Sequence, residues 1–242
     1  MWSPDTDVLI LLMDLVANGH FGTSTRLRFL TGKEKKYRVI DIRDRVSVIG
    51  MEKSKGLIGL HHFTGADWGG KFVGVSKKTW ISNYLSLSPN DEIVRTFTSM
   101  GHDLNSDPTA CKDLLDDGNL PAQYRPLEHF VCKVYSQQST IDALPSLRWE
   151  LFRKKNLEGE KLPPTRGTLI PHILRANYMS QRDKSYTTAK PVLPALEHNG
   201  WEINFQGEYV PGMCIKEPAP KAVLELVKCG CKGNCDSATV LA

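Results

Sequence analysis

Two aspartates near the start of the chain have a spacing that could bind a metal ion. Asp5 and Asp7 lie one residue apart in the segment "SPDTDVLILL", directly before a run of six apolar residues. Their carboxylate oxygens suit Mg²⁺ or Mn²⁺. The same segment suits the start of a helix, because Ser3 can cap it, Pro4 fits its first position and acids in the first turn complement the helix dipole. On these residues alone both interpretations stay open.

A second segment, "GLIGLHHFTGADWGGKFVGVSKKTWISNYL", contains residue types that can bind a phosphate group. An apolar helical stretch ends at Asp67. Small and basic residues then precede another helical pattern, namely Gly74, Ser76, Lys77 and Lys78. Glycine lets backbone N–H groups approach a phosphate, and a helix N-terminus followed by lysines favours negative charge. Such a turn can hold a nucleic-acid backbone without reading bases. The alternative is an ordinary turn followed by a solvated helix face.

Three cysteines crowd the end of the chain in "KCGCKGNC": Cys229, Cys231 and Cys235. In a reducing compartment such a cluster indicates soft-metal ligation rather than disulfides. Because a structural zinc site needs four ligands, we expect these three to be part of a larger zinc-binding module of the CxC type. The competing interpretation is a disordered end with free thiols. The other cysteines are scattered and are expected to be small core residues: Cys111, Cys132 and Cys214.

The composition is that of a globular chain with an ordinary core. Of the 242 residues, 40% are hydrophobic and 24% are charged, with a formal net charge of +4. This mildly basic balance permits an anionic partner without requiring one. No apolar stretch approaches the length of a membrane span, and residues 8–13 are too short for a secretion signal. We therefore expect an intracellular protein with no membrane partner, and its oligomeric state stays open.

The elements that would position these residues are mostly helical. Apolar and polar residues alternate on both sides of "GKEKK", which predicts a β-hairpin over residues 25–42. Residues 5–18 fit a helix, or a strand that runs into a helix. Further helical patterns cover residues 43–50, 52–67, 76–87, 91–100, 123–137, 169–178 and 217–228. The basic stretch over residues 148–161 is interpreted as an exposed helix face, and residues 183–200 as a linker.

Other residues that could bind a ligand are interpreted as packing residues. Successive residues of a helix point about 100° apart, so His61 and His62 are not expected to face one ligand. The aromatic residues near the end of the chain are spaced too irregularly for a base-stacking platform, and we expect Trp201, Phe205 and Tyr209 to form a small hydrophobic core.

Taken together, the segments resemble a known family. "SPDTDV" followed later by "TGADWGGKFVGVSKKTW" resembles the flap endonuclease family, the PIN-like 5′-nucleases, over about the first ninety residues. The chain is also similar, over nearly its full length, to uncharacterised transposon-like metazoan proteins. That similarity includes "FTGAD", "KLPPTRGTLIPHILRANY" and "AVLELVKCGCKGNC" in the same order.

The resemblance implies a site and a function. Asp5, Asp7 and Asp67 would bind Mg²⁺ or Mn²⁺ in a metal-dependent nuclease centre. A nucleic-acid strand would be held on either side of the cut by Gly74, Ser76, Lys77 and Lys78. The implied partner is nucleic acid, with DNA favoured, and the implied location is the nucleus. Zn²⁺ is expected only at the terminal cysteines.

The chain also departs from the family. The nuclease centre needs further acids from an earlier strand and from a Glu-containing helix, and this chain starts directly before the Asp5–Asp7 pair. Where the family has Gly-x-Gly, this chain has Gly74-Val75-Ser76. We therefore expect an α/β fold with an incomplete PIN-like domain, a helical extension and a Cys-rich tail. The expected boundaries are residues 1–90, 91–182, 183–228 (a linker and a small aromatic module) and 229–242.

These departures leave three functional classes. The first is a divalent-metal-dependent nuclease-like protein of transposon origin that acts on or binds DNA or RNA. The second is a non-catalytic nucleic-acid or protein interaction module that keeps the fold. The third is a fragment without function.

Overall fold

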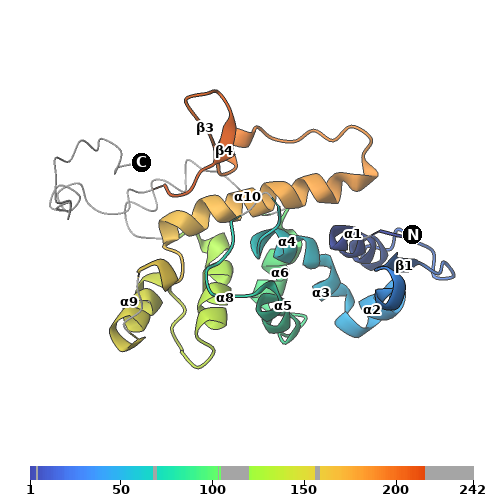
Figure 1. Cartoon of the computed structure of the whole chain (residues 1–242), viewed down its shortest axis with the longest axis horizontal. Helices are drawn as coiled ribbons and strands as arrows, with labels where there is room; N and C mark the ends of the chain where they lie inside the picture. Colours follow the sequence, from blue (N-terminus) through green and yellow to red (C-terminus); the bar gives the residue numbers. More distant parts are fainter. Residues whose placement is uncertain (4, 68–69, 103, 105–119, 156–158, 216–242) are drawn as a thin grey trace.

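The protein is described from a computed structural model that covers residues 1–3, 5–67, 70–102, 104, 120–155 and 159–215. Over these residues the fold is mixed α/β and mostly helical, with two antiparallel sheets of two strands each (Figure 1). The α/β class is thus confirmed at this coarse level, and the PIN-like domain stays a prediction. In the part of the chain described here, no helix is long and apolar enough to cross a membrane.

The first sheet ties the start of the chain to a hairpin. Strand β1 (Arg28–Thr31) pairs antiparallel with β2 (Arg38–Asp41), and the short helix η1 (Glu34–Lys36) lies in the connection. The hairpin predicted around "GKEKK" is therefore confirmed. On the other side of β1, residues 1–3 run parallel to it, with backbone hydrogen bonds of 2.8 and 3.0 Å to Leu30.

Helix α1 (Thr6–Ala17) follows directly, and its apolar residues pack into the core.

Several helices begin after an aspartate that serves as the N-cap, as at Asp41 and Asp91. The carboxylate accepts hydrogen bonds from the free N–H groups of the first turn. The remaining α-helices are α2 (Ile42–Ile49), α3 (Met51–Lys55), α4 (Leu57–Phe63), α5 (Lys77–Leu85), α6 (Glu92–Ser99), α8 (Arg125–Tyr135), α9 (Leu144–Lys155) and α10 (Arg166–Lys184). Short 3₁₀ turns are η2 (Ala122–Tyr124), η3 (Gly159–Lys161), η4 (Ser185–Thr187) and η5 (Leu196–His198).

One hydrophobic core joins these helices. At its centre, the ring of Phe97 lies 5.4 Å from that of Phe63 and 5.5 Å from that of Phe130, in edge-to-face arrangements typical of aromatic cores. Trp80 and Tyr84 of α5 are fully buried beside them. Helix α10 lies across α4, α6 and α8, as Figure 1 shows, and supplies apolar residues from Leu169 onward.

Helix α10 is longer than the sequence pattern predicts, and it contains a proline. Pro171 lacks an N–H, so the carbonyl of Gly167 has no donor within the helix. The backbone N–H of Ile215 donates to this carbonyl at 3.1 Å. The helix therefore continues through the proline because a later segment supplies the missing hydrogen bond.

The second sheet is a small hairpin that lies over α10 (Figure 1). It pairs β3 (Trp201–Ile203) with β4 (Tyr209–Pro211). The expected aromatic core is wrong in part, because only Trp201 is buried, whereas Phe205 at the turn is 96% exposed. Tyr209 is also exposed and donates its hydroxyl to Glu197 at 2.7 Å. The connection between β3 and β4 is too short for the side chain of Phe205 to reach back and pack against the hairpin.

Candidate functional site

Asp5 and Asp7 lie at the N-terminus of α1 in different surroundings. Asp5 is the N-cap, and its Oδ1 accepts a hydrogen bond from the backbone N–H of Asp7 at 3.0 Å. Ser3 does not cap the helix; its Oγ accepts from the backbone N–H of Asp5 at 3.1 Å. The carboxylate of Asp7 extends from the first turn and is 39% exposed. Asp5 therefore has the role expected of a residue that starts a helix, whereas the carboxylate of Asp7 is available for other contacts.

Asp7 faces a histidine and, behind it, a lysine. Nε2 of His61 in α4 lies 3.1 Å from Oδ1 of Asp7, without hydrogen-bonding geometry between them. On the other side of the ring, Nζ of Lys77 donates to Nδ1 of His61 at 2.9 Å. Because Nδ1 accepts from an ammonium group, the ring proton is on Nε2 and faces the carboxylate. Burial, followed by the positive charge of Lys77, lowers the pKa of His61 to about 4, so the ring is neutral at pH 7.

The negative charge of Asp67 acts on both Asp7 and Lys77, and the four residues Asp7, His61, Asp67 and Lys77 are called the acid–histidine–lysine cluster here. Burial raises the pKa of Asp7, and the nearby negative charges of Asp5 and Asp67 add to this shift. Burial lowers the pKa of Lys77, and the charges of Asp7 and Asp67 oppose this shift. The Lys77 amine also donates to the carbonyl of Gly65 at 2.9 Å. The two segments singled out in the sequence therefore meet at the start of α1, the end of α4 and the start of α5.

The neighbouring His62 belongs to a separate pair. Its Nε2 donates to Oδ2 of Asp183, in the last turn of α10, at 2.9 Å. Burial acts to raise the pKa of Asp183, but the hydrogen bonds and positive charges of His62 and Arg182 together lower it. The two imidazole rings meet edge to face with centroids 5.2 Å apart. The two histidines thus have different carboxylate partners, which agrees with the prediction that they do not face one ligand. The sequence around His62 gives no indication that Asp183 is its partner, because the two residues are 121 positions apart.

The residues expected to hold a phosphate are divided between the surface and the interior. Gly74 has a positive φ of 73° and open space around it. Ser76 is the N-cap of α5, and its Oγ accepts from the backbone N–H of Thr79 at 3.2 Å. Lys78 is exposed, whereas Lys77 turns inward to the cluster. Three of the four predicted residues thus lie at the surface, and the fourth has another role.

The cluster does not fit a metal ion in this arrangement. The carboxylate of Asp5 already accepts the capping hydrogen bond of α1, and Nδ1 of His61 already accepts a hydrogen bond from the Lys77 amine. Among the described residues, no three His, Cys, Asp or Glu side chains form a group that could hold a metal ion. The expected Mg²⁺ or Mn²⁺ site therefore stays a prediction. Cys229, Cys231 and Cys235 lie outside the described residues, as does Cys111, while Cys132 is a buried core residue as expected.

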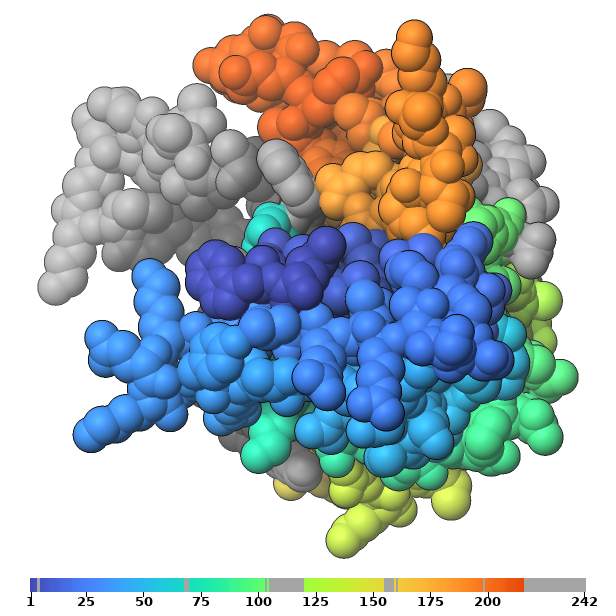
Figure 2. Space-filling model, turned by 90° about the vertical axis from the view of Figure 1, so that its right-hand side faces the viewer, coloured from blue at the N-terminus to red at the C-terminus, as the bar shows by residue number. Residues whose placement is uncertain are grey.

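A basic hairpin beside the cluster was not singled out from the sequence. Residues 24–45 contain eight Lys and Arg against three Asp and Glu. Most of these cations are exposed. Six lie in or next to the β1–β2 hairpin, namely Arg26, Arg28, Lys33, Lys35, Lys36 and Arg38, and the seventh, Arg45, lies on α2. Figure 2 looks onto this end of the molecule, where the N-terminal segment and the hairpin, in shades of blue, make up the middle of the face. The cations are visible in "GKEKK", where the alternation on both sides predicts the hairpin but not a binding surface.

The outward face of this sheet also carries apolar and aromatic side chains. Trp2 pairs with Leu30, and Leu30 pairs with Val39, so their side chains share one face. Trp2 and Val39 are each 54% exposed, and Tyr37, just before β2, is 48% exposed. On the opposite face, Phe29 is buried in the core. The hairpin is thus anchored by Phe29 on one face and carries the exposed Trp2 and Val39 on the other, with exposed cations in its connection and along its strands.

The hairpin and the acids of α1 are close neighbours. The backbone N–H of Ser3 donates to Leu30 at 3.0 Å, and Asp5 follows two residues later. Two residues span at most about 7 Å. The start of α1 therefore lies next to the hairpin.

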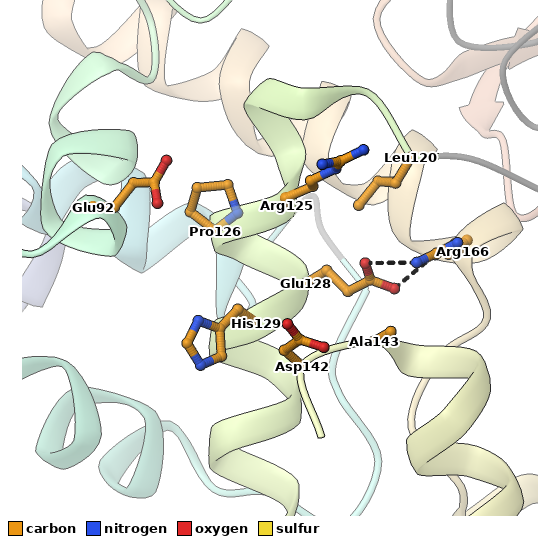
Figure 3. A pocket seen from close by; sticks show the side chains of 9 residues that line it. All are labelled: Glu92, Leu120, Arg125, Pro126, Glu128, His129, Asp142, Ala143 and Arg166. Atoms are coloured by element: carbon orange, nitrogen blue, oxygen red, sulfur yellow. Dashed lines mark hydrogen bonds and ion pairs between the residues drawn. The ribbon is translucent and has the colours of Figure 1, made fainter. Parts of the chain in front are cut away.

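Two cavities elsewhere are lined by residues with structural roles. One, of about 360 Å³, contains Glu128, whose carboxylate accepts from Nε and Nη2 of Arg166 at 2.7 and 3.1 Å and from the Leu144 N–H at 2.9 Å (Figure 3). These bonds join α8, α9 and α10. The other, of about 250 Å³, is mostly apolar and is lined by Phe72 and His172 among others, with Nε2 of His172 donating to the carbonyl of Phe63 at 2.6 Å.

Comparisons with protein-family models, with curated proteins and with solved structures found no match for this chain.

Proposed function

We propose that this chain is a nucleic-acid-binding module of nuclease type, and that the β1–β2 hairpin binds the phosphate backbone of single-stranded DNA. The observation that carries the proposal is the row of exposed cations on a hairpin that is hydrogen-bonded to the segment leading into Asp5 and Asp7. Lysine and arginine that neutralise phosphates release counterions, which supplies sequence-independent affinity.

The exposed aromatic residues favour a single strand over a duplex. Proteins that bind single strands combine a basic surface with rings on which bases stack. Trp2 and Tyr37 meet this requirement because both are about half exposed on a hairpin that is fixed to the core by Phe29. The resemblance to nucleases supports the same partner.

The test compares two double variants of equal charge change. Lys35→Gln/Lys36→Gln removes two cations from the hairpin, and Arg153→Gln/Lys154→Gln removes two exposed cations from α9, at the opposite end of the molecule (Figure 1). Binding of a fluorescent single-stranded DNA is measured by anisotropy over a range of salt concentrations. We expect only the hairpin variant to lose affinity, with the slope of log K against log salt shallower by about 0.7 for each lost phosphate contact.

Equal losses in the two variants would mean that binding follows net charge alone, and would contradict the proposal. Trp2→Ala adds an independent probe. Loss of a stacked base costs about 1–3 kcal/mol and does not change the salt slope. An unchanged affinity for Trp2→Ala would remove the single-strand preference while leaving backbone binding in place.

A second candidate is metal-dependent cleavage of phosphodiesters, as the resemblance implies. The observation that favours it is that Asp5 and Asp7 lie together at the start of α1, where the negative charge of Asp67 also acts on Asp7. The assay is cleavage of a flap-bearing DNA with Mn²⁺ or Mg²⁺, with Asp7→Asn/Asp67→Asn as the matched inactive variant. Cleavage that is equal in the two proteins, or absent from both, would exclude these residues from such a reaction.

A further inference from the structure

The mostly apolar cavity of about 250 Å³, named the α10 cavity after the helix that lines it, has the size of a site for a small molecule. Leu169, His172 and Arg175 line it from positions three residues apart, which share one face of α10. Phe72 and Leu162 line it from other segments. An engineered apolar cavity of about 150 Å³ binds benzene, so the α10 cavity has room for a substituted aromatic ring.

The described lining of the α10 cavity contains two cations, Arg175 and Lys71, and no acid. Arg175 is only 4% exposed, whereas Lys71 is exposed and lies toward solvent. The charge of Glu202 acts on Arg175, but no carboxylate of the described residues forms an ion pair with it. A buried cation without an ion-pair partner favours an anion, and an apolar cavity beside it favours an anion with an apolar body.

The guanidinium of Arg175 lacks the acceptor that a second buried arginine has. Its Nη1 donates to the carbonyls of Gly200 and Gly212, while its Nε is buried and has no partner among the described residues. In Arg166, by contrast, Nε and Nη2 donate to the two oxygens of Glu128 at 2.7 and 3.1 Å (Figure 3). Such two-point pairing with a carboxylate is what the arginine fork is shaped for. The side of Arg175 that would make this pair is unoccupied by any described residue.

Nδ1 of His172 adds a hydrogen-bond acceptor to the same wall. Nε2 carries the ring proton and donates it to the carbonyl of Phe63 at 2.6 Å, so Nδ1 has a free lone pair. No described residue donates to Nδ1. A Cβ at Gly70, which also lines the cavity, would lie 3.7 Å from this atom. An acceptor in this position favours a ligand with a donor, such as a hydroxyl group.

We propose that the α10 cavity binds a small aromatic carboxylate with a ring hydroxyl, the carboxylate at Arg175 and Lys71 and the hydroxyl at Nδ1 of His172. The ring then lies against Phe72, since aromatic side chains favour aromatic partners. The proposal does not rest on DNA binding, because neither the β1–β2 hairpin nor the acid–histidine–lysine cluster lines this cavity.

The test is titration of 4-hydroxybenzoate into the full chain, measured by calorimetry. 4-Hydroxybenzamide has the same shape without the charge, and it should bind at least about tenfold more weakly, because hydrogen bonds to charged groups are the stronger ones. Benzoate keeps the charge and lacks the hydroxyl, and it should bind roughly fivefold more weakly. These two comparisons separate the charge from the hydroxyl.

A pair of lysine variants divides the effect of charge between the two cations. Lys71→Gln should reduce the preference for the carboxylate over the amide by about threefold, because an exposed cation contributes little. The preference that remains belongs to Arg175. Lys78→Gln removes an exposed cation that does not line the cavity, and it should leave the preference unchanged.

Cys214 reports whether the ligand occupies this cavity. The residue lines the α10 cavity and is half-buried. Its alkylation by iodoacetamide, followed by mass spectrometry, should slow about tenfold when 4-hydroxybenzoate is present at ten times its Kd. Gly70→Val places methyl groups beside Nδ1 of His172 and should abolish binding, whereas Gly159→Val, at a position with nothing within 4 Å, should not.

The proposal is overturned if 4-hydroxybenzoate does not bind, or if the amide binds as tightly as the acid. Binding that leaves the alkylation rate of Cys214 unchanged would place the ligand elsewhere and would equally overturn it. The alkylation experiment uses the unaltered chain, so the test holds even where Gly70→Val does not fold.

Discussion

His61 and His172 are buried imidazoles whose protonation opposes folding. Burial is the main cause for both, and it lowers the pKa of each to about 4 from 6.5. The charge of Lys77 adds to the shift at His61, and that of Arg175 adds to the shift at His172, whose hydrogen bond to Phe63 works against it. Neither ring has room for a solvated charge, so each stays neutral through the mildly acidic range.

The unfolding free energy should therefore fall as the pH is lowered from about 6.5 to about 4. In this window the unfolded chain takes up a proton at each imidazole and the folded chain does not, so stability is full above the window and is lost within it. Each histidine contributes on the order of 3 kcal/mol by the lower end. The raised pKa of Asp7 works in the opposite direction near that end. Urea unfolding across this range measures the slope.

His172→Gln keeps a donor for the Phe63 carbonyl and should reduce the slope by about half. His129→Gln is the matched control, because His129 is exposed on α8, and it should leave the slope unchanged. A slope that is the same in all three proteins would show that the buried histidines are not its source.

At the scale of elements, the fit between α10 and the β3–β4 hairpin depends on one glycine. Gly200 has a φ of +82°, and a Cβ there would lie 2.3 Å from the carbonyl oxygen of Pro171. Gly207, at the turn of the same hairpin, has a φ of +79° and nothing within 4 Å. The two positions share the backbone requirement and differ only in the contact with α10.

This pair separates backbone strain from steric exclusion. Gly207→Ala should cost about 1 kcal/mol of unfolding free energy, which is the penalty of a left-handed conformation for alanine. Gly200→Ala should cost about 3 kcal/mol or more, because the hairpin must also move away from the helix. Thermal unfolding of the two variants measures the difference. Equal costs would mean that the hairpin can shift freely on α10.

Prediction from sequence succeeded where a local signal decides the structure. The hairpin around "GKEKK" and the helix starts at Asp5 and Asp91 were set by turn residues and by capping carboxylates. The length of α10 was missed, because its continuation through Pro171 depends on Ile215, which is distant in the sequence. Phe205 was assigned to a core because its hydrophobicity gives no information about a solvent-facing turn.

The same limit applies to the candidate site. Asp7, Asp67 and Lys77 were chosen from motifs, and the structure brings their charges together. The inward turn of Lys77 and the pairing of His62 with Asp183 could not be inferred, since both depend on how α4 packs against α5 and α10. Nearby residues in a helix show which face they share, but not which distant element covers that face.

At the scale of the whole molecule, one buried side chain connects the second hairpin to the core. Nη1 of Arg175, in α10, donates to the carbonyls of Gly200 (2.8 Å) and Gly212. These two carbonyls lie on either side of the hairpin, and the hairpin itself contributes Trp201 as its buried residue.

Arg175→Met should therefore loosen residues 199–215 while the helical core stays folded. We expect amide hydrogens of β3 and β4 to exchange at least tenfold faster in the variant, with little change in α4, α6 and α8, because local opening needs less free energy than global unfolding. Hydrogen exchange followed by mass spectrometry provides the measurement. Faster exchange throughout the chain would mean that the hairpin and the core unfold as one unit.

The first sheet has an open edge with consequences for the chain in solution. Within the residues described, β1 has neighbours on both sides, whereas β2 pairs with β1 alone. An unpaired strand edge is a template for adding a strand from another copy, and clustered positive charge is one way in which proteins prevent this. Lys35, Lys36 and Arg38 give this edge such a charge. The cations that we propose attract a polyanion would then also keep two copies of the hairpin from joining edge to edge, so neutralising them favours self-association.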